Sequence, residues 1–259
     1  MLRTENIAYS IGSKQILKGI SLDFVPGEFV MILGPNGSGK STFLKIFSGE
    51  IPHFHGKVFY DDQSISHLSK EELSTRRAVM SQQTELSFPL TVEEVVMMGR
   101  YPHFTFSPDK KDLSICNEVL RRMNLEAFRE RNYTTLSGGE KQRVQYARVL
   151  AQIWEKPASG HRYLFLDEPL NNLDISYQQD FLQIASLLKN ENTVLVAVMH
   201  DINLAIHYAD RLVFFKEGEM VGCGAPRELV STELIKHVFN VETKVFENPM
   251  TGGPLVVYV

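Results

Sequence analysis

The chain has 259 residues, of which 43% are hydrophobic, and a formal net charge of −4. This length and apolar content allow one α/β domain, or a domain with a subdomain, around a large core. The slightly acidic balance and the lack of a long basic run argue against nucleic acid as a partner. No apolar run approaches the roughly 20 residues of a membrane span, so we expect a cytosolic chain whose membrane role would come through a partner.

The first 33 residues have the patterns of β-strands. Residues 7–10 and 20–24 alternate apolar with small or polar side chains, which is typical of half-exposed antiparallel strands. Tyr9 lies in the first of these strands and has two interpretations. It either packs in the sheet, which its position favours, or stacks on a nucleotide base. Residues 29–33 are all apolar and predict a buried strand.

A glycine-rich loop follows this buried strand and opens a helix. It fits the pattern G-x-x-x-x-G-K-[ST] with one further hydroxyl, in the residues Gly34, Pro35, Asn36, Gly37, Ser38, Gly39, Lys40, Ser41 and Thr42. The glycines let successive N–H groups face phosphate oxygens, and the helix adds the positive end of its dipole. We expect Lys40 to reach the β- and γ-phosphates and Ser41 to bind Mg²⁺. The strand–loop–helix context argues against a turn without a ligand.

Helical patterns dominate the middle of the chain, where we expect a helical subdomain at residues 84–154. It would be inserted into an α/β core of residues 1–83 and 155–240. The predicted elements are a helix capped by Ser69 at 68–77, a strand at 78–81, and helices at 91–98 and 113–123. The aromatic segment 101–108 has two interpretations, local packing, which we favour, or a contact surface for another protein.

The next helix begins at Leu136-Ser137-Gly138-Gly139-Glu140. Ser137 and Glu140 have the spacing of a capping box, and the two glycines leave the amides of the first turn uncovered. Such a helix start is suited to an anion. On these residues alone, a capped helix without a ligand is equally consistent.

Polar residues follow two further apolar runs, residues 163–166 and 193–199, which predict buried strands. The first run leads into Asp167 and Glu168, which favour a Mg²⁺ ligand and a general base over a structural carboxylate pair. The second leads into His200. A single histidine is more often a packed core residue, but ligands of open parallel sheets bind beyond the carboxyl ends of the strands.

The end of the chain is less informative. Residues 212–215 predict another strand, residues 226–239 predict one helix, and residues 241–259 form a Gly-Pro-rich tail of short strands. This tail is too short for a regulatory domain of ordinary size.

In their order along the chain, these motifs together with Gln82 resemble the ATP-binding subunits of ABC transporters over nearly the whole length. The sequence Leu-Ser-Gly-Gly-Glu is the specific part, because many other nucleotidases carry a phosphate loop and an acidic strand end. The resemblance implies an α/β fold of the P-loop NTPase class. It comprises a RecA-like, mostly parallel core sheet, an N-terminal antiparallel β subdomain and an inserted helical signature subdomain.

The resemblance also implies site roles around ATP and Mg²⁺. Two copies would close head to tail, so that Ser137, Gly138 and Gly139 of one contact the γ-phosphate held by residues 34–42 of the other. The further roles are adenine stacking for Tyr9, sensing of Mg²⁺ and the γ-phosphate for Gln82, Mg²⁺ ligation for Asp167, switching for His200 and signalling across the dimer for Asp174.

One departure concerns the residues between the acidic pair and Asp174. Many relatives have small and hydroxyl residues there, whereas this chain has Leu170-Asn171-Asn172-Leu173. Asp174 keeps its place, so the role across the dimer is expected to survive. The hydrogen bonds of the intervening residues cannot be carried over from the family.

Within the family, residues 88–96 and 199–205 look like importers of iron chelates, haem and cobalamin. Residues 151–162 and 248–255 are similar to the ATPases of haemin importers, so we favour haemin over a ferric siderophore or cobalamin as cargo.

The resemblance implies an ATPase homodimer on the cytoplasmic side of the plasma membrane, with two membrane permease subunits and a periplasmic or surface substrate-binding protein. A soluble ABC ATPase without a transport role is the competing class. Single copies of each motif and the lack of sustained heptads argue against it.

Overall fold

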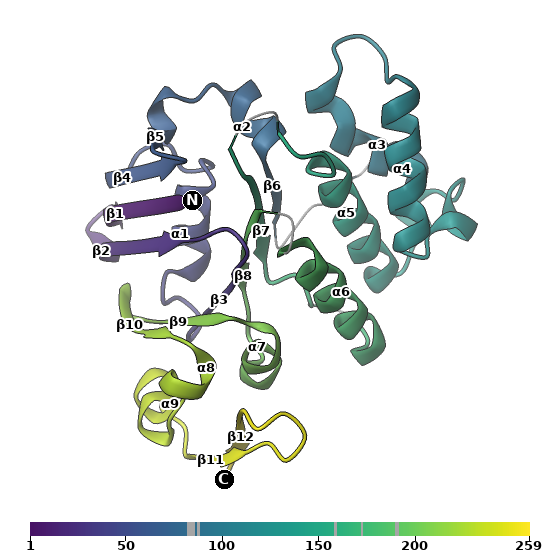
Figure 1. Ribbon diagram of the computed structural model, residues 1–259. Coiled ribbons are helices and arrows are strands. Elements are labelled where there is room, and N and C mark those ends of the chain that lie inside the picture. The colour runs from purple at the N-terminus through teal and green to yellow at the C-terminus, as the bar shows by residue number, and fades with distance from the viewer. Residues whose placement is uncertain (82–85, 87–88, 158–159, 172, 190–191) are drawn as a thin grey trace. The chain divides into compact units, whose positions relative to one another are not determined.

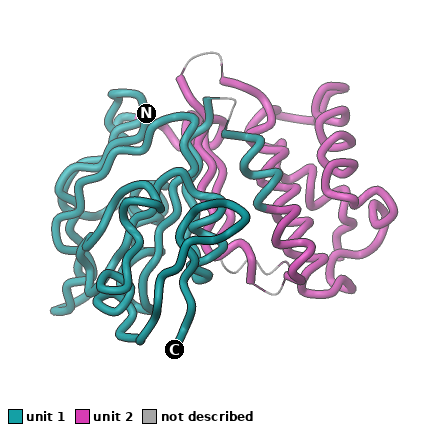
Figure 2. Tube along the Cα trace, turned by 60° about the horizontal axis from the view of Figure 1, so that its bottom comes forward, with its two compact units in different colours: residues 1–67, 182–259 teal, residues 68–181 magenta. Residues whose placement is uncertain are grey.

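The computed structural model describes residues 1–81, 86, 89–157, 160–171, 173–189 and 192–259. The chain forms two compact units, which Figure 2 shows in different colours. Unit 1 comprises residues 1–67 and 182–259, and unit 2 comprises residues 68–181.

The N-terminal part of unit 1 is an antiparallel sheet with the strand order β2-β1-β4-β5 (Figure 1). Its strands are β1 (Leu2–Ile11), β2 (Lys14–Phe24), β4 (His55–Tyr60) and β5 (Gln63–Ser64), and the short helix η1 (Ile65–His67) follows. Leu2 pairs with Phe24 across the β1–β2 hairpin, and both side chains are buried. The predicted half-exposed strands at 7–10 and 20–24 are confirmed in this hairpin.

A second sheet in unit 1 is centred on β3 (Phe29–Leu33). This strand lies between β8 (Thr193–Val198) and β9 (Arg211–Lys216) and runs parallel to both. Strand β10 (Glu219–Gly224) adds an antiparallel neighbour to β9. Every residue of β3 and β8 is buried, as expected for parallel strands covered on both faces. The predicted apolar strands at residues 29–33, 193–199 and 212–215 are confirmed.

Helix α1 (Lys40–Phe47) joins the two sheets of unit 1 through aromatic contacts. Its Phe43 lies 5.4 Å from Phe215 of β9, and its Phe47 lies 5.2 Å from Phe24 of β2, measured between ring centroids. The remaining elements of unit 1 are α7 (Ile202–Tyr208), α8 (Pro226–Leu229), α9 (Thr232–Phe239) and the hairpin of β11 (Thr243–Glu247) with β12 (Pro254–Tyr258).

The prediction of one helix over residues 226–239 is wrong, because the chain breaks at Val230 and Ser231 into α8 and α9. Both residues have extended backbone angles, and the Ser231 hydroxyl accepts a hydrogen bond from the backbone N–H of Leu234. A serine that satisfies such an amide starts a new helix instead of continuing the old one.

Unit 2 pairs β6 (Arg77–Met80) in parallel with β7 (Arg162–Asp167) and adds a group of helices (Figure 1). These are α2 (Lys70–Arg76), α3 (Val92–Met97), α4 (Lys110–Arg122), α5 (Gly138–Gln152) and the short η2 (Met98–His103), η3 (Glu126–Phe128) and η4 (Tyr133–Thr135). Helix α6 (Ile175–Leu188) begins in unit 2 and ends in residues of unit 1. Within the described ranges, no helix combines the length and the apolar character needed to span a membrane.

Capping boxes begin four helices of unit 2. The predicted boxes of Ser69 and Ser137 are present, each closed by a glutamate three residues later. Thr91 forms a third box with Glu94, and Asp109 forms a fourth with Asp112. Reciprocal side-chain bonds satisfy two amides that a helix start otherwise leaves unpaired. The sequence therefore fixes these helix starts locally.

Three side chains cap the opposite end of α5. Arg100, His103 and Arg162 donate hydrogen bonds to the four consecutive backbone carbonyls of residues 151–154, at 2.7 to 2.9 Å. The last carbonyls of a helix have no partner within it, and positive charge near them is favourable to the helix dipole. Both arginines are at most 2% exposed, so this end of α5 is closed by buried cations.

Gly99 brings η2 directly against α5. A Cβ atom at Gly99 would lie 2.1 Å from the backbone oxygen of Arg148, which no side chain can occupy. The next residue, Arg100, also pairs with Asp112 at 2.9 Å and with Glu155 at 2.5 Å. This buried guanidinium therefore links η2, α4 and the end of α5, and its own charge is compensated by two carboxylates.

Tyr146 provides a test of the packing of α5. Its fully buried ring stacks on Phe181 with 3.8 Å between centroids, and its hydroxyl has no hydrogen-bond partner among the described residues. We expect Tyr146→Phe to raise the free energy of unfolding by about 1 kcal/mol, because it removes an unpaired buried hydroxyl. Tyr146→Ala, which also removes the ring, should lower it by about 3–5 kcal/mol. Urea denaturation measures both, and a less stable Tyr146→Phe variant would contradict the expectation.

Candidate functional site

The predicted phosphate loop connects β3 to α1 in unit 1, and two of its glycines are required by their surroundings. Gly34 has a φ of 150°, and a Cβ atom there would lie 2.2 Å from the backbone oxygen of Phe215. Gly39 has a φ of 100°, and its Cβ would lie 2.7 Å from Leu17. Only glycine accommodates both the backbone angles and these close approaches.

The interior of this loop carries the polar groups that an anion needs. Lys40 is 4% exposed, and its ammonium group donates to the backbone oxygens of Gly34 at 2.8 Å and Pro35 at 3.1 Å. The hydroxyl of Ser38 is buried and has no hydrogen-bond partner among the described residues. In the described chain, no side chain caps the N-terminal amides of α1. A buried unpaired hydroxyl beside an uncapped helix start fits phosphate oxygens.

His200 lies at the same edge of the unit 1 sheet as this loop. Ile32 of β3 pairs with Val198 of β8, and the backbone N–H of Met199 donates to the Ile32 oxygen at 3.0 Å. The two parallel strands therefore end side by side, one leading into Gly34 and the other into the exposed His200. Asp201 then caps α7.

Tyr9 stands opposite Leu17 in the β1–β2 hairpin. Directly opposite residues of antiparallel strands point to the same face, and Leu17 is the residue that approaches Gly39. Tyr9 is partly exposed, and its partner Leu17 is the link between this hairpin position and the phosphate loop. This placement is compatible with stacking on a nucleotide base.

The acidic pair ends β7 in unit 2. Asp167 is 2% exposed, and Glu168 has a φ of 52°, in the left-handed region that residues with a side chain rarely adopt. Asp174 is exposed directly before α6, where its backbone oxygen accepts a hydrogen bond from Gln178. Gln82, which is predicted to sense Mg²⁺ and the γ-phosphate, lies outside the described residues.

Three side chains that were not predicted from the sequence hold the turn after Glu168. Gln142 of α5 donates to the backbone oxygen of Pro169 at 2.9 Å, and Gln178 of α6 donates to that of Leu173 at 3.1 Å. Asn171 donates to the carboxylate of Glu168 itself at 2.9 Å. Only Asn171 was noticeable in the sequence, as a departure from the family pattern.

The predicted anion-binding start of α5 also lies in unit 2. The Ser137 hydroxyl accepts from the backbone N–H of Glu140 at 3.3 Å, while the Glu140 carboxylate accepts from that of Ser137 at 2.7 Å. These hydrogen bonds with Ser137 lower the pKa of Glu140, which keeps the carboxylate charged. Ser137 and Gly138 are exposed and Gly139 is partly exposed, so a ligand can approach this helix start.

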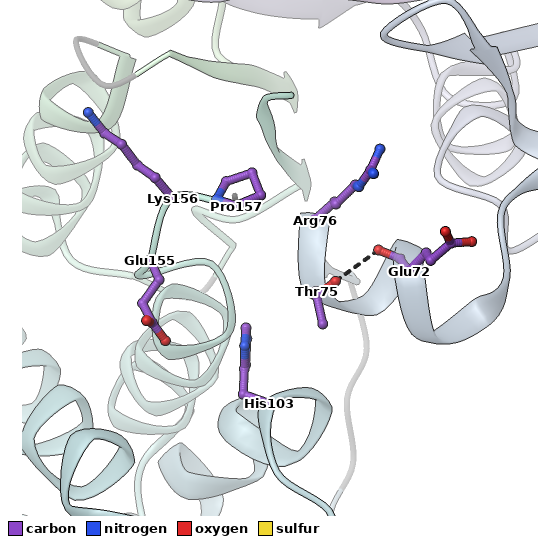
Figure 3. Close-up of a pocket in the computed structure, with 7 residues that line it drawn as sticks. All are labelled: Glu72, Thr75, Arg76, His103, Glu155, Lys156 and Pro157. Carbon is purple, nitrogen blue, oxygen red and sulfur yellow. Dashed lines mark hydrogen bonds between the residues drawn. The ribbon is translucent and has the colours of Figure 1, made fainter. Parts of the chain in front are cut away.

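A pocket of about 310 Å³ within unit 2 is made by other residues (Figure 3). Its lining comes from α2, η2 and the segment after α5, namely Glu72, Thr75, Arg76, His103, Glu155, Lys156 and Pro157. Figure 3 shows the ring of His103 directed into the pocket. Burial lowers the pKa of His103, and the neutral ring donates through Nε2 to the Gln152 oxygen. Among the residues that the structure describes, none predicted to bind ATP or Mg²⁺ lines this pocket.

The aromatic segment 101–108 only partly fits the favoured interpretation of local packing. Tyr101 contacts Phe104 with 5.7 Å between ring centroids, but Tyr101 remains 57% exposed. Phe106 is 97% exposed, so its ring is scarcely covered by the part of the chain that the structure describes. The exposed pair of aromatic rings is more typical of a contact surface than of a buried cluster.

Comparisons with known proteins agree with this arrangement. Residues 17–171 match the family model described as ABC transporter. The chain is 40% identical over 257 residues to the hemin import ATP-binding protein HmuV of Gloeobacter violaceus, covering 99% of this chain and 94% of that protein. It is 37% identical over 258 residues to the protein of the same name from Escherichia coli O157:H7, covering 99% of both.

Solved structures confirm the fold. An inward-facing metal-chelate type ABC transporter superposes with a TM-score of 0.81 at 23% identity, covering 100% of this chain and 96% of that one. A dimeric bacterial ABC transporter cassette gives 0.74 at 29% identity, covering 87% and 98%. The predicted α/β fold of the P-loop NTPase class is thereby confirmed. The chain therefore belongs to the ABC transporter family, as one of its ATP-binding subunits.

Proposed function

We propose that the chain is the ATP-hydrolysing subunit of a haem importer. The observation that carries this proposal is the 40% identity, over nearly the full length, with a relative named hemin import ATP-binding protein. A homodimer would sit on the cytoplasmic face of the membrane beneath two permease subunits. A periplasmic or surface binding protein would deliver the cargo, and a ferric siderophore or cobalamin is the alternative cargo.

The phosphates of ATP are assigned to residues 34–42. The buried hydroxyl of Ser38, the uncapped amides of α1 and the ammonium group of Lys40 support this assignment. Ser41 and Asp167 supply hydroxyl and carboxylate oxygens, the donor type that Mg²⁺ prefers, and Gln82 joins them on sequence alone. Bound Mg²⁺ would neutralise charge on the transferred phosphoryl group. Tyr9 would stack on the adenine.

Hydrolysis is assigned to Glu168. Its carboxylate would take a proton from water as the water oxygen attacks the γ-phosphorus in line, while the bond from that phosphorus to the β-phosphate oxygen breaks. Lys40 would balance the developing negative charge. Ser137, Gly138 and Gly139 of the second subunit would contact the same γ-phosphate. His200 would sense the γ-phosphate, Asp174 would signal across the dimer, and release of the products would reopen it.

Glu168→Gln tests the assignment of the base. The amide keeps the size of the side chain but cannot accept the proton, so we expect ATP binding to persist while the hydrolysis rate falls by about 10²-fold or more. A dimer should accumulate with ATP, which size-exclusion chromatography detects. Glu130→Gln, at an exposed carboxylate outside the site, is the matched control. Rapid hydrolysis by Glu168→Gln would remove Glu168 from this role.

A second prediction concerns the exposed rings of Tyr101 and Phe106. Replacing both by alanine should weaken attachment to the permease by about tenfold or more, because exposed aromatic side chains often anchor protein interfaces. Basal ATP hydrolysis should be unchanged, since neither residue is assigned to the nucleotide. Co-purification with the permease measures the effect, with the exposed Leu113→Ala on α4 as control. Unchanged co-purification would contradict a role in binding the permease and favour the interpretation of the segment as local packing.

The cargo is tested by reconstituting the complete transporter with its binding protein. ATP hydrolysis should be stimulated by haemin and not by a ferric siderophore or cobalamin. Stimulation by another chelate would keep the importer and replace the cargo. Failure to find any membrane partner would favour an ABC ATPase without a transport role.

A further inference from the structure

The turn after the acidic pair contains a hydrogen bond between two functional candidates. The side-chain amide of Asn171 donates through Nδ2 to Oε2 of Glu168 at 2.9 Å. Because an ionised carboxylate can only accept, the NH₂ group of the amide must face it. The main chain closes the same turn, since the backbone N–H of Asn171 donates to the Glu168 oxygen at 3.4 Å.

The backbone of this turn is held from both sides within unit 2. Gln142 of α5 binds the oxygen of Pro169, and Gln178 of α6 binds the oxygens of Leu170 and Leu173. A residue such as Glu168 keeps its left-handed φ only when its surroundings impose it. The Cα of Glu168 is therefore fixed, and rotation of its side chain decides where the carboxylate points.

The contact depends on the length of the Asn171 side chain. The nitrogen of an asparagine side chain lies one bond farther from the backbone than a serine hydroxyl. This extra bond lets Asn171 reach the carboxylate of a residue three positions earlier. An asparagine at this position therefore provides a donor of the length that the contact requires.

We propose that Asn171 is a positioning residue for hydrolysis, whose amide orients the Glu168 carboxylate towards the attacking water. The proposal rests on the assignment of Glu168 as the base. The orientation of such a group matters, because a misplacement of about 1 Å in an active site can cost about 10²-fold in rate. A residue that only stabilised the turn would change stability or ATP affinity instead.

Two substitutions remove the donor. Asn171→Asp has the same shape but places a second carboxylate beside Glu168, and Asn171→Ala removes the contact. We expect kcat to fall by about 10-fold or more in both, with the KM for ATP unchanged, because ATP binding is assigned to residues 34–42. Asn171 is exposed, so the melting temperature should not change. Asn171→Gln keeps an amide donor and should recover part of the rate.

The pH dependence of kcat distinguishes a positioning role from a purely structural one, because a structural role would not change it. The charge of Glu168 should raise the pKa of the carboxyl group that Asn171→Asp places beside it. The loss in this variant should therefore shrink as the pH falls from about 8 to about 5, because a growing fraction of that carboxyl group is protonated and can donate to Glu168. The loss in Asn171→Ala should stay constant over this pH range, because alanine has no side-chain group that can donate. Asn124→Asp adds an equal charge at another exposed site of unit 2 and should keep the wild-type rate.

The Glu168→Gln background separates this proposal from the one it rests on. If Asn171 acts through Glu168, adding Asn171→Ala to Glu168→Gln should cause no further loss. An unchanged kcat in Asn171→Asp and Asn171→Ala would overturn the positioning role alone, and so would an equal loss in both backgrounds. An active Glu168→Gln variant would instead overturn the assignment of the base.

Discussion

The site depends on a close backbone approach at the start of the phosphate loop. The oxygen of Phe215 occupies the space that a side chain at residue 34 would need, so β9 and the loop meet without a gap. Strand β3 lies between β8 and β9 in parallel register, and this fixes both the loop and the end of β8 at one edge. Lys40, Ser38 and His200 lie at this edge as a consequence, and Lys40 also donates to the backbone oxygens of Gly34 and Pro35.

The two units contribute different chemistry. Unit 1 contains the predicted phosphate loop, Tyr9 and His200, whereas unit 2 contains the acidic pair and the exposed start of α5. In the proposed function, the phosphates of ATP bind to residues of unit 1, and the proposed base, Glu168, belongs to unit 2. In the proposed cycle, ATP contacts residues of both units and also the start of α5 of a second subunit. Dimer closure is then needed before hydrolysis can occur.

Local rules explain which features could be predicted. The capping boxes of Ser69 and Ser137 and the glycines of the phosphate loop involve residues within a few positions of one another. The break before Ser231 was missed because a serine inside a helical pattern caps a new helix only when its neighbour adopts extended angles. The bond between Gln142 and Pro169 joins residues 27 positions apart. Such contacts depend on how helices pack, which spacing alone does not reveal.

Side chains bind backbone groups at both ends of α5, with the capping box at Ser137 and three donors, two of them buried arginines, on the carbonyls of residues 151–154. A helix sealed in this way cannot gain or lose a turn without leaving charged groups unpaired. Its 15 residues span roughly 22 Å at the usual rise. Displacement of η2, which holds two of the three donors, must therefore move the whole helix, and α5 behaves as a rod of constant length.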